Sequence, residues 1–192
     1  MHDQILTHIQ RHIRLDAQGR NYFLAQLRSR SIKKKELLLE AGEICKTISY
    51  VHKGALRAFY QGPDGKEATM MFAIDDWWIT DMPCFIRESP AMISIEAIED
   101  SSVWQLTKND LDNLYTQVPA FERFFRILMQ NAYVREQLRT LENLSLPAAE
   151  RYQNFLKKYP SIAQQVAQKD IASYLGITPE FLSVIRSKRA IS

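Results

Sequence analysis

Residues 168–188, which read QKDIASYLGITPEFLSVIRSK, constrain the fold of this 192-residue chain more than any other stretch. Apolar residues recur there at helical spacing in two short groups, and these are Ile171, Ala172 and Leu175, then Ile177, Leu182 and Ile185. Gly176 ends the first helix because glycine readily takes the positive φ of a helix C-terminus. Thr178 then caps a second helix, in which Pro179 suits the first position. Two short helices joined by a glycine-containing turn predict a helix-turn-helix, and an ordinary αα-corner is the alternative that the pattern leaves open.

The second helix of this pair is expected to face DNA. With the apolar set packed inward, the residues predicted to contact DNA are Thr178, Pro179, Glu180, Ser183, Val184, Arg186, Ser187, Lys188 and Arg189. Glu180 could accept a hydrogen bond from cytosine N4, whereas the basic residues suit the phosphate backbone. Residues 145–192 hold 7 Lys+Arg against 3 Asp+Glu, while the rest of the chain has a net charge of −1. A basic module on a nearly neutral body fits double-stranded DNA as the partner.

Between residues 36 and 107 the apolar pattern changes from helical spacing to short runs rich in β-branched and aromatic residues. Turn residues separate these runs, and residues 62–65 (GPDG) are a strong hairpin signal. Six or more strands at even spacing predict a β-sandwich or a jelly-roll-like barrel. Residues 1–30 are expected to be helical, with Asp16 as a cap, and residues 76–90 to interrupt the strands with a short helix or loop.

A long helical pattern follows from residue 120 to residue 144, after a brief helix from Thr107 to Tyr115. About 25 residues of helix extend ~37 Å, which is too long for a small domain to cover. A second copy of the chain is the natural partner, as in a parallel coiled coil, and packing on the chain's own barrel is the alternative. The residues predicted to form this dimer seam are Phe121, Phe125, Leu128, Ala132, Leu138 and Leu141.

Composition narrows the class of protein further. Hydrophobic residues make up 46% of the chain and charged residues 24%, as in ordinary globular proteins. No apolar run approaches the ~20 residues of a membrane span, and the amphipathic N-terminus does not resemble a secretory signal. Cys45 and Cys84 form no metal-type pair, so we expect buried free thiols in a reducing cytosol. A cytoplasmic protein without membrane contact, metal or cofactor is expected.

The order of roll, long helix and helix-turn-helix resembles the Crp/Fnr superfamily of transcription regulators. Residues 37–43 (LLLEAGE), 50–57 (YVHKGALR) and 170–180 (DIASYLGITPE) carry this resemblance. The AERYQNFLKKYP and ITPEFLS segments look like the subgroup common in Bacteroidetes.

Membership implies an α+β homodimer that binds DNA, with RNA polymerase among its candidate partners and a small-molecule effector that the sequence does not name. It implies a cyclic-nucleotide-binding-like β-roll sensor over residues 1–119, a dimerisation helix over 120–144 and a winged helix-turn-helix domain over 145–192. The sequence ends soon after the predicted recognition helix, so the wing is expected to be short or absent.

The predicted effector pocket departs from the family pattern. In cyclic-nucleotide-binding relatives a Gly-Glu pair begins the phosphate-binding cassette and an Arg followed by Ser or Thr ends it. Here Thr80-Asp81 and Ala91-Met92 occupy these places, and Pro83 stands where a small residue is usual. The cyclic phosphate would lack its cation and face the charge of Asp81, so cyclic AMP is not expected to be the effector. The residues expected to line this degenerate pocket are Trp78, Thr80, Asp81, Met82, Phe85, Arg87 and Met92.

Two other classes of function stay open at this point. A ligand-binding module would keep the roll and use its C-terminal helices only for dimer packing. A cupin-like enzyme would need several metal-ligating histidines in the barrel, and the barrel sequence offers only His52. We therefore expect no enzymatic activity, and we expect His52 to be structural rather than a haem ligand.

Overall fold

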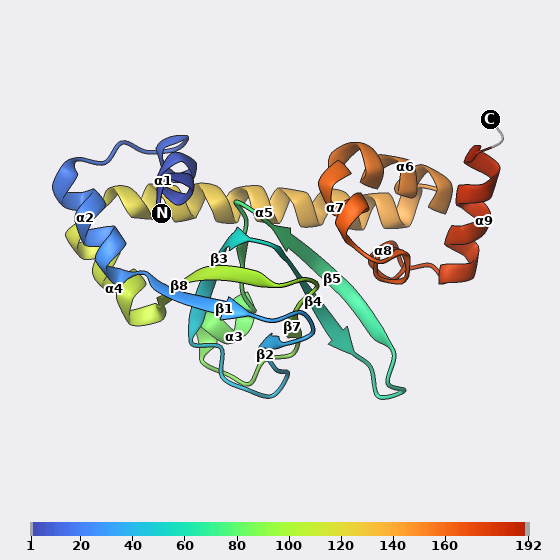
Figure 1. Cartoon of the computed structure of the whole chain (residues 1–192), viewed down its shortest axis with the longest axis horizontal. Coiled ribbons are helices and arrows are strands. Elements are labelled where there is room, and N and C mark those ends of the chain that lie inside the picture. Colours follow the sequence, from blue (N-terminus) through green and yellow to red (C-terminus); the bar gives the residue numbers. More distant parts are fainter. Residues whose placement is uncertain (1, 191–192) are drawn as a thin grey trace.

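The computed structural model describes the backbone of residues 2–190 and the side chains of residues 2–188. A β-roll lies along one part of the long helix α5, and four further helices gather around the other end of α5 (Figure 1). The elements in chain order are α1 (Asp3–Gln10), α2 (Ala17–Gln26), β1 (Arg28–Ile32), β2 (Leu37–Leu39), β3 (Thr47–Lys53), β4 (Ala55–Gln61), β5 (Glu67–Ile74), β6 (Trp78–Ile79), α3 (Met82–Arg87), β7 (Ser94–Ala97), β8 (Ser101–Thr107), α4 (Lys108–Gln117), α5 (Ala120–Ser145), α6 (Ala148–Lys158), α7 (Pro160–Gln165), α8 (Gln168–Tyr174) and α9 (Pro179–Ala190).

The roll consists of two antiparallel four-stranded sheets, with strand orders β1-β8-β3-β6 and β2-β7-β4-β5. Strands β4 and β5 form the hairpin expected at residues 62–65. The amide of Gly62 donates to the carbonyl of Lys66 over 2.8 Å, and Gly65 takes a φ of 78°. The main core includes Ile48, Leu56, Ile95, Val103 and Leu106, which the two sheets contribute. The predicted β-roll is confirmed.

The N-terminal segment differs from the prediction in one respect. Helices α1 and α2 form as expected, and Asp16 caps α2 by accepting a hydrogen bond from the amide of Gly19 over 2.7 Å. Residues 28–32, however, are not helical but form strand β1, which pairs with β8 from Arg28↔Gln105 to Ile32↔Ser101. The backbone groups at this edge of β8 need partners, and this long-range pairing outweighs local helix propensity.

A partly buried polar cluster attaches α1 to the roll. Asp76 accepts hydrogen bonds from the hydroxyl of Tyr50 (2.7 Å) and the guanidinium of Arg11 (2.6 Å), and its carboxylate lies 3.0 Å from Nδ1 of His8. Burial lowers the pKa of His8, although the carboxylate of Asp76 opposes this effect. The imidazole is therefore favoured in its neutral form in the folded protein.

Helix α5 has two different halves. Phe121 and Phe124 are fully buried and Phe125 is 5% exposed, because these rings pack on the roll and on α2; Phe23 stacks on Phe121 with ring centroids 4.8 Å apart. In the second half Leu138 and Leu141 are 48% and 59% exposed. The prediction that Phe121 and Phe125 belong to a dimer seam is therefore corrected, since their side chains are occupied within the chain.

The solvent exposure of the other predicted seam residues increases along α5, from the core to the surface. Leu128 packs partly against the main core, Ala132 is half-buried, and Leu144 is 82% exposed beyond Leu141. An apolar stripe on a helix that leaves the roll requires a covering surface. The two-fold seam thus stays a prediction for the second half of α5.

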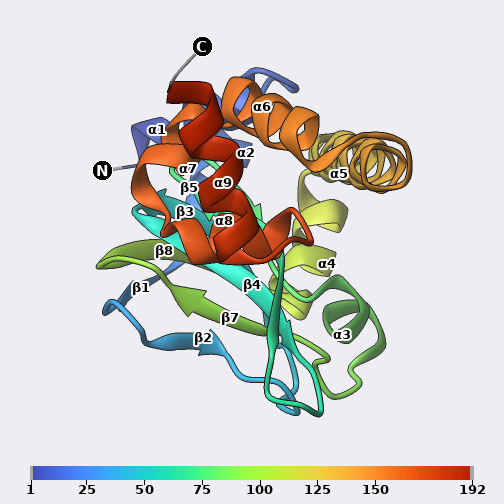
Figure 2. The same ribbon diagram turned by 90° about the vertical axis from the view of Figure 1, so that its right-hand side faces the viewer.

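A second core holds the C-terminal helices together and attaches them to the roll. Its buried members are Phe72, Tyr152, Phe155, Ile162, Val166, Ile171, Ala172, Leu175 and Leu182. Phe72 belongs to β5, and its ring lies 5.4 Å from that of Tyr174 and 6.4 Å from that of Phe155. Helix α7 contributes Ile162 to this core. Figure 2, in which α5 is seen nearly end-on, shows α6–α9 beside the end of α5.

Replacing Leu138 with Asp should weaken self-association by about 10- to 100-fold, because the variant buries an unpaired charge in the proposed seam. Sedimentation equilibrium measures the monomer–dimer ratio. Thr140→Asp is the matched control: Thr140 is exposed on another face of α5, where its hydroxyl bonds to the carbonyl of Glu136. A Leu138→Asp protein that stays as dimeric as the control would place the interface elsewhere.

Candidate functional site

The turn between α8 and α9 has the geometry that its residues predict. Gly176 takes a φ of 67°, and a Cβ there would meet nothing within 4 Å, so the backbone conformation rather than space favours glycine. The amide of Ile177 donates to the carbonyl of Ala172 over 3.0 Å. The hydroxyl of Thr178 accepts a hydrogen bond from the amide of Phe181 over 3.2 Å, as an N-cap does, and Pro179 begins α9. The predicted helix-turn-helix therefore forms.

One face of α9 is free of the core. Leu182 is fully buried, whereas the predicted DNA-facing side chains from Thr178 to Lys188 are exposed, namely Thr178, Pro179, Glu180, Ser183, Val184, Arg186, Ser187 and Lys188. The ninth, Arg189, has a side chain outside the described residues. Ser187 already donates its hydroxyl proton to the carbonyl of Val184, so toward a ligand its oxygen can only accept. Contact of these residues with DNA stays a prediction.

The sequence reading missed one residue of this face. Phe181 is 50% exposed, next to Val184 at 46%, so α9 presents an apolar strip among its polar groups. The sequence offered one signal that Phe181 belongs to this face, namely its place in the helix between Glu180 and Leu182. Figure 1 shows α9 at the far end of the molecule from α1 and α2, running across the direction of α5.

The predicted effector-pocket residues do not converge on a common space. Trp78 packs edge-to-face against Tyr50 (ring centroids 5.4 Å apart) and against Phe125 (5.3 Å). Phe85 is 2% exposed and Met82 packs against the same core, while Arg87 and Met92 point to the surface, Met92 being 68% exposed. These side chains fill the core or cover the outside of the roll.

Asp81 corrects a specific expectation. Its carboxylate does not face a ligand but is 2% exposed, and its two oxygens accept hydrogen bonds from the amides of Cys84 (3.1 Å) and Met92 (3.0 Å). The first bond caps α3 and the second ties the end of the cassette to its beginning. Asp81 is thus a structural anchor of this segment.

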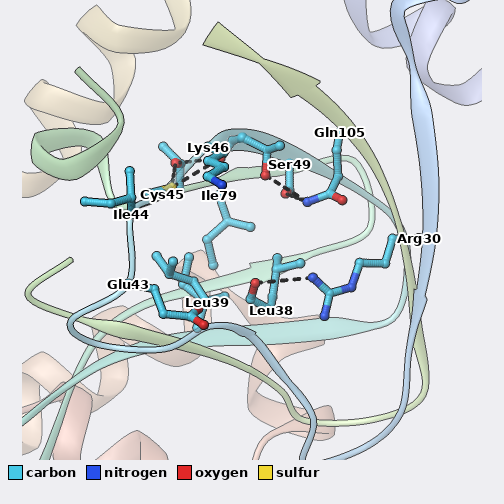
Figure 3. Close-up of a pocket in the computed structure, with 13 residues that line it drawn as sticks. Arg30, Leu38, Leu39, Glu43, Ile44, Cys45, Lys46, Ser49, Ile79 and Gln105 are labelled. Atoms are coloured by element: carbon cyan, nitrogen blue, oxygen red, sulfur yellow. Dashed lines mark hydrogen bonds between the residues drawn. The ribbon is translucent and has the colours of Figure 1, made fainter. Parts of the chain in front are cut away.

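A cavity of about 510 Å³ lies between the two sheets instead (Figure 3). The residues that line it are Arg30, Leu38, Leu39, Glu43, Ile44, Cys45, Lys46, Thr47, Ser49, Ile79, Thr80, Ile95 and Gln105. Of the predicted pocket residues, Thr80 is the one that reaches it. On its polar side the amide of Gln105 donates to the hydroxyls of Thr47 (2.9 Å) and Ser49 (3.2 Å). The sequence signal for this cavity was the pair of polar residues at alternate positions of β3, Thr47 and Ser49.

The guanidinium of Arg30, on the cationic side of this cavity, already has hydrogen-bond partners within the protein. Arg30 donates to the carbonyls of Leu37 (3.2 Å) and Leu38 (3.5 Å) and pairs with Glu36. Polar and apolar walls face each other, as in sites for small organic molecules. The cavity has a volume that could hold such a molecule, and its lining does not include Ala91 or Met92.

The two cysteines are buried free thiols, as predicted. The amide of Cys45 lies 2.8 Å from Sγ of Cys84, and burial raises the pKa of the Cys84 thiol. His52 is half-buried with its ring 6.2 Å from that of Trp104. Within residues 2–190, no group of three or more His, Cys, Asp or Glu side chains could hold a metal ion. No helix in the same range is both long and apolar enough to cross a membrane.

Asp81→Ala should lower the free energy of unfolding by roughly 2–4 kcal/mol, since a lost cap and a newly unpaired buried N–H each contribute about 1–2 kcal/mol. Asp81→Asn should lose about half as much, because one amide oxygen can still cap α3. Urea unfolding followed by tryptophan fluorescence measures both. Asp16→Ala, an exposed cap of α2, provides the comparison at about 1 kcal/mol. Equal stability of Asp81→Ala and the parent protein would contradict the anchoring role.

Comparisons with known proteins agree with this architecture. Residues 29–118 match the family model of the cyclic nucleotide-binding domain. The transcriptional activator Anr of Pseudomonas aeruginosa is 27% identical over 167 residues, which span 81% of this chain and 68% of the activator.

Among solved structures, the c-di-GMP responsive global regulator CLP of Xanthomonas campestris superposes with a TM-score of 0.71 at 16% identity, covering 92% of each chain. A protein of Eubacterium rectale assigned to transcriptional regulators of the Crp/Fnr family gives a TM-score of 0.71 at 18% identity, covering 92% of this chain and 84% of that one. These structural likenesses show the fold.

Proposed function

The chain belongs to the Crp/Fnr superfamily, and on that premise we propose that it is a homodimeric transcription regulator that reads a palindromic operator independently of cyclic AMP. The observation that carries this proposal is α9. A capped helix follows a short glycine turn, buries Leu182, and exposes a polar and basic face at one end of the molecule. This is the arrangement by which a recognition helix enters the major groove.

The remaining parts of the chain fit the same function. Residues 1–119 would form the sensor, residues 120–144 the dimerisation helix and residues 145–192 the DNA-binding domain. The similar proteins are transcription regulators rather than enzymes, so we propose no catalytic activity and place the protein in the cytoplasm, with RNA polymerase as a candidate partner. The Bacteroidetes-type subgroup stays a prediction.

Independence from cyclic AMP rests on charge. A cyclic phosphate that enters the roll loses its water, and burying an ion without a partner is unfavourable. At the position of the family arginine this chain has Ala91, which is 5% exposed, and the nearby Arg87 points to the surface. The amide of Met92 already donates to Asp81, and Pro83 has no N–H to offer.

Calorimetric titration with cyclic AMP should therefore give no binding in the micromolar range, because the missing charge-assisted contact alone weakens affinity by about ten- to a hundredfold. The matched variant Ala91→Arg/Met92→Ser restores the arginine pair of the family cassette and should bind more tightly than the parent chain. Micromolar binding by the unmodified chain that also tightens its association with DNA would overturn this part of the proposal.

Selection from random double-stranded DNA should yield a palindrome with half-sites about one helical turn, ~34 Å, apart, because a two-fold protein reads a two-fold site. Arg186→Ala should weaken binding to all sequences and reduce the salt slope by about one per contact, as a phosphate contact does. Glu180→Ala should instead change the preferred bases. Lys66→Ala, on the exposed β4–β5 hairpin, is the charge-matched control and should change neither.

Failure to enrich any sequence, with binding that is also insensitive to Arg186→Ala and Glu180→Ala, would reject α9 as a recognition helix. The alternative function would then gain support, namely a ligand-binding roll whose C-terminal helices serve only dimer packing. The cavity between the sheets would be its site.

A further inference from the structure

A single buried cation links the roll to the helix-turn-helix. Arg57 lies on β4 and is 3% exposed, and each of its nitrogens meets a different carboxylate. Nη2 donates to Glu67 over 2.5 Å, Nη1 to Asp170 over 3.1 Å and Nε to Glu96 over 3.3 Å. Glu67 and Glu96 belong to the roll, whereas Asp170 lies 113 residues away on α8. The Arg57 side chain therefore bridges two domains.

The charges in this cluster depend on one another. Burial opposes the charge of Arg57, but the hydrogen bond to Glu67 and the charges of Asp170, Glu67 and Glu96 outweigh it and raise the pKa of Arg57. The guanidinium also lies over the ring of Phe59, 4.3 Å from its centroid. Removing one partner of a buried ion pair leaves an uncompensated charge, so the cluster favours the arrangement in which α8 contacts the roll.

Neighbouring contacts fix the rotation of α8. The hydroxyl of Ser173 accepts from the amide of Thr69 over 2.8 Å and donates to the carbonyl of Glu67 over 2.9 Å, so one turn of α8 bonds directly to β5. Arg139 of α5 donates to the carbonyls of Thr69 and Tyr174, each over 3.3 Å, with its guanidinium 4.2 Å from the Tyr174 ring centroid. Strand β5, α5 and α8 thereby meet at one junction.

This junction sets the direction of the recognition helix. A short turn connects α8 to α9, and Leu182 of α9 packs in the core shared with Ile171, so α9 follows α8. Helix α9 lies at one end of the molecule (Figure 1), and none of the linking residues belongs to its exposed face. Two copies related by a two-fold axis would then present their α9 helices at a fixed separation.

We propose that Arg57, acting through Asp170, is a positioning residue for DNA recognition: the roll holds α8 so that α9 is oriented for a palindromic site. The inference rests on the proposed function. In this proposal the cluster does not contact DNA. It increases the fraction of molecules in which α9 has the binding-competent orientation, and it restricts the distance between half-sites that the dimer can bind.

The test compares two variants that each remove one carboxylate from Arg57. Asp170→Asn removes the negative charge that pairs with Arg57 across the domains, and Glu96→Gln removes one that pairs with it inside the roll. Hydrogen–deuterium exchange without DNA should show faster exchange over residues 67–74 and 168–175 in Asp170→Asn, and unchanged exchange over residues 168–175 in Glu96→Gln. Ser173→Ala, which removes the second link, should act like Asp170→Asn and is a milder change.

The DNA measurements use the palindrome selected with the parent protein. Asp170→Asn should bind it about tenfold more weakly, as expected if the competent orientation falls to about a tenth of the population. It should also tolerate one extra base pair between the half-sites better than the parent does. A merely destabilised protein would lose affinity at both spacings alike, so the ratio between the two spacings identifies positioning.

Three outcomes decide the inference. Faster exchange together with a relaxed spacing preference in Asp170→Asn and Ser173→Ala supports it. Unchanged exchange in both variants would show that the junction does not hold α8. Faster exchange with unchanged or tighter DNA binding would show that the junction does not position α9. Either result overturns the inference. A parent protein that binds no DNA rejects the proposed function instead, and the exchange data still report whether Arg57 holds α8.

Discussion

Helix α5 imposes the main physical constraint on this protein, because it is longer than the roll can cover. Its first turns carry Phe121, Phe124 and Phe125 into the main core, where they fix the helix to the sheets. Its later turns carry Leu138 and Leu141 into solvent while keeping the apolar spacing of a packed helix. One element therefore contributes to the core of the roll, exposes an apolar stripe beyond it and supports the C-terminal helices.

Desolvation of charged groups determines how the parts are joined. Asp81 and Arg57 are withdrawn from water and Asp76 is partly so, and each has several hydrogen-bond partners that compensate for the loss. Two of these groups act locally, since Asp81 closes the cassette segment and Asp76 attaches α1 to β3. Arg57 alone among the three joins the roll to the C-terminal helices. A buried polar group without its partners would be unfavourable, so such groups make each arrangement specific.

The roll illustrates how a fold can persist while its site changes. The chain matches the cyclic nucleotide-binding domain over residues 29–118, yet Asp81 of its cassette segment is buried on the amides of Cys84 and Met92, and Trp78 packs against Phe125 of α5. A cavity of about 510 Å³ lies between the sheets, and Thr80 is among the residues that line it. The architecture fixes where a pocket can form, whereas individual side chains decide which molecule can enter it.

The sequence by itself determined the local elements and their order. Helical spacing, Gly176 and the cap residue Thr178 specify the helix-turn-helix, and the alternating runs with the GPDG turn specify the roll, because these depend on contacts between near neighbours in the chain. Only the tertiary structure decided what each side chain faces. Strand β1, the burial of Phe121 and Phe125 and the link from Arg57 to Asp170 all join residues distant in sequence. An apolar or charged residue has the same local pattern whether its partner lies within the chain or outside it, so folding in three dimensions is what assigns that partner.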